Sequence, residues 1–560
     1  MKLITRIWVF AALGVFAPRV ANVVLADSLP RIVITTDSPI NAQKKVDGRM
    51  KVYDSSATDA TCSYDGCIGI KWRGNSSLSF DQKKYTLELR DDAGKDRDVS
   101  LLGMPKESDW VLLAPYNDIS MLRDPFAFQL WRDMGHWAPR TSYCEVSVNG
   151  EYMGIYILSE SIKRGPDRVN ISKLKKSDTT GRELTGGYIV RVDAFDQDDA
   201  TFTSAVKGIQ TAFAAPETGF GGGFPAFGPF PGFNRDSLPM FPMFPGFDGF
   251  NPDSLPTFPG FGTFNPDSLP AFPGFGTFNP DSLPTNFTPP FGGNGEREEV
   301  LPSFGGVGGG FSPFGGAGGG FSPFGGVGGG FGGITQPGTV TWTVYYPKKK
   351  NLQPQQMDYI HRYIDQVEQS FQQGNYQQWI DLPSFVDYFI HTELSLNADG
   401  YKRSAYFYKD KDAADGTVSK LQAGPVWDYN LAFGNCNFCS ANDPEAWVYE
   451  GCYTNPTPAF WKQLAEDADF MKAVKKRYAE LRRSLLSQQR INDYIDHVAQ
   501  QLGEAKERHF AKYSNLFGDG WANPAAMFAA YTVTSYEEEI ATLKTWFATR
   551  LAFLDSQWKQ

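Results

Sequence analysis

The sequence predicts an α+β fold of two lobes, with a cleft between them and a long repeat segment inserted into the chain. Strand-like runs dominate residues 30–200, where β-branched and aromatic residues are bounded by turn residues. Helix-like runs dominate residues 338–560. Between the two, residues 215–337 consist mainly of Phe, Gly and Pro with few charges. A strand-rich half followed by a helix-rich half is the order typical of α+β folds.

The first 26 residues are typical of an export signal. Two basic residues precede an apolar run at residues 7–16, and small residues close the segment at Ala26. Pro18 ends the apolar run short of the roughly 20 residues that a membrane span needs. We therefore expect an exported protein (periplasmic, cell-surface or secreted) with no transmembrane segment. A buried N-terminal strand is the alternative.

The net charge and the cysteine content bear on which partners and which cross-links the protein has. The chain has 53 basic and 63 acidic residues, a net charge of −10, which argues against nucleic acid as a partner because phosphate neutralisation supplies most of that affinity. Six cysteines in an exported chain predict disulfides. A zinc site at Cys436, Cys439 and Cys452 is the alternative, but no His lies nearby to complete it.

The N-terminal lobe is predicted from a series of strand runs and one helix. The last run contains Asn149-Gly150, a strong signal for a two-residue hairpin turn. The helix is expected around Ser120 to Met134, with Asp118 as N-cap and Gly135 as stop. The strand runs are PRIVITTD, RMKVYD, IGIKWRG, KYTLELR, DWVLLAP and YCEVSVNGEYMGIYILSE.

The middle segment repeats two short units. FNPDSLPTFPGFGT begins at Phe250 and recurs with small changes, and FGGVGGGFSP follows from Phe304 in the same way. Pro and Gly at this density cannot sustain a helix or a strand ladder, so we expect a disordered insertion. The flanking strand-like stretches, 187–193 and 339–345, can still pair, because closure entropy grows only logarithmically with loop length. A linker is the simpler interpretation of the repeats, and contact with a surface or polymer is the alternative.

The C-terminal lobe is predicted from amphipathic helical stretches. A strand-and-turn segment at residues 404–435 separates the second helix from the third. The helices are expected at residues 354–373, 382–394, 459–488, 491–512 and 535–558.

A polar turn between two predicted strands is a candidate anion site. Its backbone N–H groups and the lysines that open the next strand form a phosphate-binding arrangement. An ordinary hairpin turn is the alternative, since the string lacks the spacing of a Walker motif. The residues are Arg73, Gly74, Asn75 and Ser76, followed by Lys83 and Lys84.

Two aspartates occupy positions suited to chemistry. Asp399 lies where the helix 382–394 gives way to a hairpin, at the expected edge of the cleft, where it could orient a hydroxyl and accept its proton. Asp428 and Asn430 lie in GPVWDYNLAFGN and are candidate metal ligands. Helix-end and turn chemistry is the alternative for Asp399, and a strand entering a turn is the alternative for Asp428.

The order of these residues is that of a protein kinase. A strand lysine, a loop aspartate and a later metal-binding aspartate follow one another, as Lys84, Asp399 and Asp428 do here. Glu160 ends a strand at the expected lobe connection, where a kinase hinge meets adenine and ribose. The strings GxGxxG, HRD and DFG are absent.

Several ordered motifs together resemble the CotH-type spore-coat protein kinase family. They are IKWRGNSS, KKYTLELRD, LLGMPKESDWVLLAPYND, MLRD, VNGEYMGIYILSESIKR, TGGYIVRVD, FVDYFIHTELSLNADGY and GPVWDYNLAFGN. The resemblance implies an atypical protein-kinase-like fold. It also implies phosphoryl transfer from ATP to a protein Ser/Thr with Mg²⁺ or Mn²⁺.

The resemblance assigns roles residue by residue. Asp399 matches the loop aspartate and Asp428 the metal aspartate, while Lys84 is the expected phosphate lysine, with Lys83 as the alternative. Ser404 stands where some members carry an asparagine that helps to hold metal, and Asn430 could supply an amide oxygen instead.

These inferences together predict an exported CotH-like kinase that binds a nucleotide and a protein acceptor. One alternative is a non-catalytic surface or envelope module with the same fold, because little ATP is found outside the cytoplasm. Another is a hydrolase that uses Asp399 and Asp428 as an acid/base pair, which leaves the lysine-bearing strand unexplained.

Overall fold

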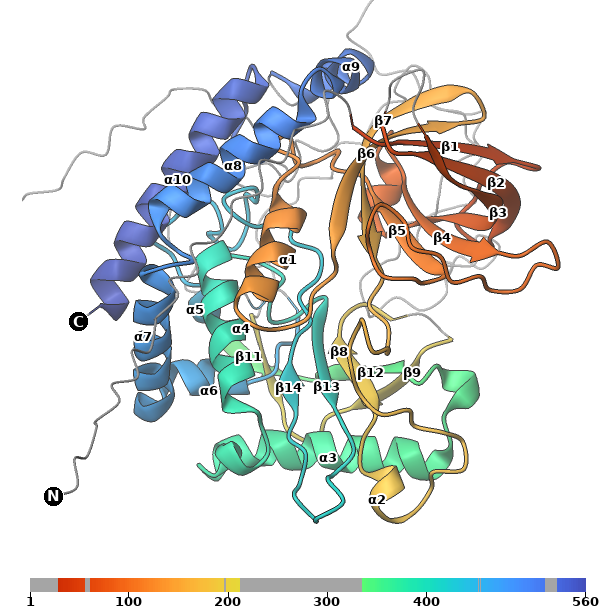
Figure 1. The fold of residues 1–560 in the computed structure, drawn as a ribbon. Coiled ribbons are helices and arrows are strands. Elements are labelled where there is room, and N and C mark those ends of the chain that lie inside the picture. Colours follow the sequence, from red (N-terminus) through yellow and green to blue (C-terminus); the bar gives the residue numbers. More distant parts are fainter. Residues whose placement is uncertain are drawn as a thin grey trace, which may run out of the picture. The chain divides into compact units, whose positions relative to one another are not determined.

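The fold is known from a computed structural model, and its described residues belong to one structural unit formed by residues 1–215 and 332–560 (Figure 1). The expected signal segment and nearly all of the expected insertion lie outside the described residues. The described ranges are 29–55, 61–195, 198–211, 335–451, 453, 455–518 and 531–559.

The N-terminal strands form a closed barrel in the order β1-β2-β3-β4-β5-β7-β6. Neighbours pair antiparallel except β1 and β6, whose parallel pairing closes the barrel. Alternate residues face inward, as the period-2 runs predict, and Ile32, Ile34 and Met50 are fully buried in the barrel core. The strands are β1 (Arg31–Thr36), β2 (Val46–Tyr53), β3 (Cys62–Arg73), β4 (Lys84–Arg90), β5 (Asp109–Leu113), β6 (Thr141–Val148) and β7 (Glu151–Glu160).

A second sheet joins segments from both sides of the insertion, in the order β14-β13-β8-β12-β9. β8 pairs antiparallel with β12, with Val192 opposite Trp342, so the prediction that the flanking stretches pair is confirmed. The strands are β8 (Tyr188–Val192), β9 (Ala200–Thr203), β12 (Thr341–Tyr346), β13 (Ala405–Lys409) and β14 (Gln422–Ala423).

A two-stranded ribbon stands where the chain enters and leaves the insertion. β10 (Gly208–Thr211) pairs antiparallel with β11 (Thr335–Gly338), and Thr211 lies opposite Thr335. The described residues on either side of segment 212–334 are therefore cross-strand neighbours.

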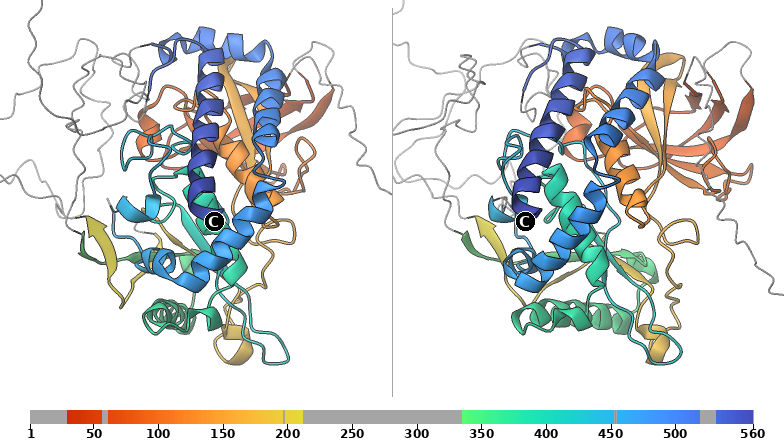
Figure 2. Two further views of the ribbon diagram at one scale, coloured as in Figure 1. Left: turned by 90° about the vertical axis from the view of Figure 1, so that its left-hand side faces the viewer. Right: turned by 60° about the vertical axis from the view of Figure 1, so that its left-hand side comes forward.

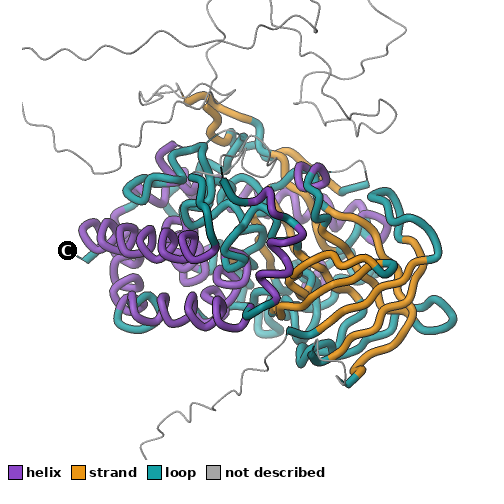
Figure 3. The backbone as a smooth tube through the Cα atoms, turned by 90° about the horizontal axis from the view of Figure 1, so that it is seen from above, coloured by secondary structure: helices purple, strands orange, loops and turns teal. Residues whose placement is uncertain are grey.

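Helices provide most of the C-terminal half, and Figure 3 shows most of them gathered to one side of the strands, although α9 packs against barrel strand β7. The C-terminal helix α10 contacts α8 and α7, which lie beside it in both views of Figure 2. No helix among the described residues is long and apolar enough to cross a membrane. The helices are α1 (Arg123–Asp133), α2 (Gly181–Leu184), α3 (Pro354–Gln372), α4 (Leu382–Ser395), α5 (Val448–Gly451), α6 (Phe460–Glu466), α7 (Ala468–Arg482), α8 (Gln488–Leu502), α9 (Ala505–Lys512) and α10 (Tyr536–Trp558).

Two predicted helices are each divided in the structure. The stretch 459–488 breaks at Asp467, whose side chain accepts a hydrogen bond from the Phe470 amide and caps the start of α7. The stretch 491–512 breaks at Gly503, which has a φ of +46° and ends α8. Predicting one continuous helix was wrong in both cases, because the apolar period persists across each break.

The predicted helix near residue 120 is confirmed with a later start. α1 begins at Arg123 and its N-cap is Leu122, so the prediction of Asp118 as N-cap was wrong. Asp118 still satisfies a first-turn amide from outside the helix, because its Oδ2 accepts a hydrogen bond from the Arg123 backbone N–H at 2.9 Å. Gly135, with a φ of +106°, follows the helix end as expected.

Candidate functional site

The structure brings together two of the predicted site residues, Lys84 and Asp428. Lys84 begins β4 opposite Arg73 of β3, and its side chain is 10% exposed. Its Nζ lies 3.6 Å from Asp428 Oδ1, and the Asp428 side chain is 47% exposed. A nearly buried ammonium thus faces a carboxylate that solvent can still reach.

Lys83 has a different environment from its neighbour. Its Nζ donates to the carbonyl oxygens of Leu78, at 2.9 Å, and Phe80. Burial lowers the pKa of its ammonium group. Lys83 therefore ties down the turn before β4, and of the two lysines it is Lys84 that faces Asp428.

The predicted anion loop lies next to the same site. The Arg73 guanidinium stacks over the Trp427 ring, 5.1 Å from its centre, and Trp427 directly precedes Asp428. Gly74 has a φ of +120°, and a Cβ there would collide with Ser77 Oγ. A 3-10 turn, η1 (Ser76–Ser79), follows Asn75. Phosphate binding by this loop stays a prediction.

The loop that follows β14 contains residues 428–435, which we call the metal loop after the role predicted for Asp428. Asp428 has a φ of +64°, a left-handed conformation that aspartate adopts more readily than most residues with a Cβ. The Asn430 side-chain Nδ2 donates to Asn117 Oδ1 at 3.1 Å. The metal-binding role of Asn430 stays a prediction, and the hydrogen bond shows that its amide group is held in place.

Asp124, in the first turn of α1, is a carboxylate at this site that was not selected from the sequence. It is buried, and its Oδ1 accepts a hydrogen bond from the Tyr429 amide at 2.6 Å. Burial raises the pKa of Asp124 to about 7, the positive charge of Lys84 opposes this rise, and the negative charge of Asp428 adds to it. The MLRD string contained Asp124, but nothing in its pattern distinguishes it from an ordinary first-turn acid.

Asp193, just after β8, is a second carboxylate that sequence reasoning missed. It pairs with Arg191 at 3.0 Å and accepts hydrogen bonds from the Ala194 amide and the Ser404 amide. Burial raises its pKa, and the charge of Asp428 contributes to the rise. Ser404, the other predicted metal ligand, thus lies beside Asp193 through its backbone and has a φ of +49°.

Asp399 lies beyond the C-terminal end of α4. Its carboxylate is 3.7 Å from the Nζ of Lys402, whose side chain is buried, and its backbone N–H donates to Asn397 Oδ1 at 3.2 Å. The end of α4 is tied to the metal loop, because the Phe433 amide donates to the Ser395 carbonyl at 2.7 Å. The role of Asp399 as a base stays a prediction.

Glu160 ends β7, where the chain passes from the barrel toward β8, so its position is that of the predicted connection. Its buried carboxylate accepts from the Arg140 amide at 3.0 Å and from the guanidinium groups of Arg140 and Arg168 at 2.7 and 2.6 Å. The carboxylate therefore holds the end of β7 to Arg140 and Arg168. Contact of Glu160 with a nucleotide stays a prediction.

Cysteine chemistry differs in part from the sequence expectation. Cys62, Cys67, Cys144 and Cys436 are free thiols, so disulfide formation is not met at these four positions. Cys452 lies outside the described residues.

The chemistry of the donor set fits a hard divalent cation held largely by water and phosphate. Within the ranges that the structure describes, no three His, Cys, Asp or Glu side chains are grouped to hold a metal ion. Mg²⁺ does not need such a group, because it usually keeps several waters and takes one or two carboxylates together with substrate phosphates. Asp428, partly exposed beside Lys84, is suited to that mode.

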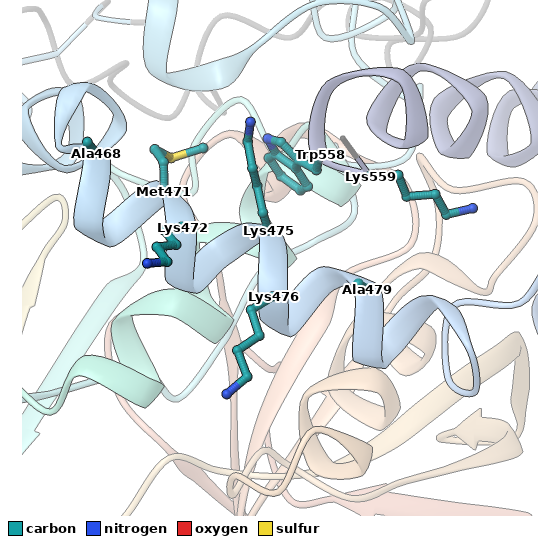
Figure 4. A pocket seen from close by; sticks show the side chains of 8 residues that line it. All are labelled: Ala468, Met471, Lys472, Lys475, Lys476, Ala479, Trp558 and Lys559. Carbon is teal, nitrogen blue, oxygen red and sulfur yellow. The ribbon is translucent and has the colours of Figure 1, made fainter.

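A surface hollow of about 570 Å³ lies elsewhere, along α7 and the end of α10 (Figure 4). Lys475 rises beside Trp558, whereas Lys472 and Lys476 extend from the other side of α7. None of the predicted site residues lines this hollow; its lining residues are Ala468, Met471, Lys472, Lys475, Lys476, Ala479, Trp558 and Lys559.

Comparison with protein families gives one match. The family described as CotH kinase protein matches residues 70–213 and 337–554. The matched ranges contain every predicted site residue, and the gap between them coincides with the predicted insertion to within two residues. No curated protein matches the chain.

Proposed function

Because the chain belongs to the CotH kinase family, we propose that it transfers a phosphoryl group from a metal-bound nucleotide to a protein Ser/Thr or another hydroxyl. The observation that carries the proposal is the 3.6 Å approach of Lys84 to Asp428, beside the anion loop and the buried carboxylate of Asp124. A kinase site needs a cationic group for phosphate and an anionic group for metal at close range.

In this proposal different residues bind the phosphate groups and the metal ion. Lys84 holds phosphate oxygens, and the loop from Arg73 to Ser76 covers them. Asp428, with Asn430 or Ser404, would hold Mg²⁺ or Mn²⁺. A metal ion held there would supply positive charge that offsets the negative charge of the phosphates. Positioning of this electrostatic kind supplies most of the rate enhancement in phosphoryl transfer.

Asp399 orients the acceptor hydroxyl and accepts its proton. The tie between Phe433 and Ser395 supports this role, because it couples the segment that carries Asp399 to the metal loop. The Asp399 carboxylate lies 3.7 Å from the Nζ of Lys402, so a cationic group stands beside the proposed proton acceptor.

A non-catalytic binding module is the second candidate function. It is favoured by Ser404, which stands in place of a ligating asparagine, and by the expected export of the chain through residues 1–26. In that case the nucleotide would bind without transfer, or the repeat segment would make the functional contacts.

A transfer assay with labelled ATP distinguishes the kinase from the non-catalytic binding module. Purified protein is incubated with ATP labelled at its terminal phosphate and Mg²⁺ or Mn²⁺, with acceptor proteins of the same organism, and incorporation is compared among wild type, Asp428→Ala and Asp399→Asn. Transfer by wild type that both variants lose supports the kinase. Equal label in all three would show that the proposed residues do not catalyse transfer.

A further inference from the structure

The sequence motif from Asn117 to Asp124 contacts the metal loop, although the proposed function gives most of it no role. Asn117 accepts from Asn430 through its side chain and from Asn435 Nδ2, at 2.7 Å, through its carbonyl. Asp124 accepts from the Tyr429 amide. The segment from Asn117 to Asp124 thus accepts hydrogen bonds from residues near the start and at the end of the metal loop.

Arg123 holds the later part of the same loop. Its Nε donates to the Ala432 carbonyl at 3.0 Å, and its Nη2 lies 3.4 Å from the Phe433 carbonyl oxygen. The side chain has no exposed surface. Arginine presents its donors in a rigid planar fork, so these contacts fix the direction of the loop as well as its distance from α1.

The charge of Arg123 is balanced by one acid of its own segment and by one from another part of the chain. Its Nη1 pairs with Asp118 and with Glu539 Oε1, the latter at 2.8 Å, and Glu539 lies in the first turn of α10. Tyr531 also accepts from Nη2 at 2.8 Å. A buried guanidinium keeps its position only while its charged partners remain, because an uncompensated buried charge is strongly unfavourable.

The metal loop needs such support. Asp428 and Phe433 both have positive φ values, +64° and +52°, which are sparsely populated for residues with a Cβ. Left without restraint, the loop would relax to other conformations and move the Asp428 carboxylate away from Lys84.

We propose that Glu539 of the C-terminal helix positions the metal loop through Arg123. Glu539 and Arg123 are positioning residues, since neither contacts the reacting groups. The consequence for metal binding rests on the proposed function, whereas the consequence for the order of the loop does not.

The first measurement is hydrogen exchange of the backbone amides of residues 429–435. Glu539→Gln keeps the size of the side chain and a hydrogen-bonding oxygen but removes the charge. We expect exchange in the loop to rise by about tenfold, while exchange in the barrel strands is unchanged. Arg123→Lys should act in the same direction, because a lysine cannot reproduce the fork.

The matched control is Arg482→Lys. Arg482 joins α7 to the other end of α10 through Asp555, at 2.8 and 2.9 Å, and within the described residues it forms no hydrogen bond with the metal loop. The Arg482→Lys substitution should lower the free energy of unfolding without increasing amide exchange in the metal loop. Equal exchange in Glu539→Gln and Arg482→Lys, or an unchanged loop in Glu539→Gln, would overturn the inference.

The second measurement is calorimetric binding of a non-hydrolysable ATP analogue with Mn²⁺. We expect the Kd to rise about tenfold in Glu539→Gln and to stay near the wild-type value in Arg482→Lys. If wild type does not bind the analogue, the nucleotide-dependent function fails, and the exchange experiment alone decides the positioning role.

Discussion

Lys84 and Asp428 face each other at 3.6 Å, one from the first position of a barrel strand and the other from a loop of the C-terminal half. Lys84 comes from the first family-matched range and Asp428 from the second. The contact therefore makes the candidate site a product of both halves of the chain.

Replacing Lys84 should separate the role of this lysine from that of its neighbour. We expect Lys84→Met to reduce phosphoryl transfer by at least about 100-fold, because the proposed phosphate-binding cation that faces Asp428 is lost. Lys83→Met should instead lower the free energy of unfolding by about 1–2 kcal/mol, since it removes hydrogen bonds to two carbonyl groups. Transfer rates and chemical denaturation of both variants test this; a larger loss of transfer in Lys83→Met would reverse the assignment.

Gly74→Ala should impair nucleotide binding. At a φ of +120° an alanine is strained, and its Cβ would also displace Ser77 Oγ, so we expect the anion loop to shift. We expect the KM for ATP to rise about tenfold. Gly94→Ala is the matched control: it also has a positive φ, +75°, but a Cβ there meets nothing within 4 Å. Similar KM values for the two variants would mean that the loop does not touch the nucleotide.

Residues 212–334 should be removable without loss of the fold. Thr211 and Thr335 are cross-strand neighbours, so an Asn-Gly pair joining them forms a two-residue hairpin turn. We expect the shortened protein to keep its melting temperature within about 3 °C and to bind nucleotide as before. Thermal unfolding and binding are compared with a variant that carries a Gly/Ser linker of the original length. Unfolding of the shortened protein alone would show that the segment stabilises the core.

Stability should fall as the pH rises toward 8, because of Glu368. This carboxyl group on α3 is buried beside Ser204, and burial raises its pKa from 4.5 to about 8. Between these two pH values the folded state binds a proton that the unfolded state has released, so raising the pH favours unfolding. The stabilising contribution is complete below about pH 4.5 and is lost as the pH rises through about 8.

Glu368→Gln removes this titration while keeping a hydrogen-bonding side chain. We expect the difference in melting temperature between wild type and Glu368→Gln to change in favour of the variant as the pH increases from about 5 to about 9. Thermal unfolding across this range measures it. A difference that is constant with pH would mean that Glu368 does not titrate there.

Strand positions, the order of the candidate site residues and the location of the insertion could be predicted from the sequence. Period-2 runs placed the barrel strands, because alternation depends on each strand's own inward and outward faces. The order of the motifs selected Lys84, Asp399 and Asp428, and the composition of residues 215–337 predicted an insertion where the family match is interrupted. These features are local or depend on order along the chain, so they can be predicted without a structure.

The tertiary structure shows which side chains contact one another. It distinguished Lys84 from Lys83, since the two differ in what surrounds them and not in type. It added Asp124 and Asp193, whose importance comes from burial beside Asp428. It also linked Glu539 to the metal loop through Arg123. Burial, pairing and charge balance arise between distant segments, and a linear pattern contains no distances between them.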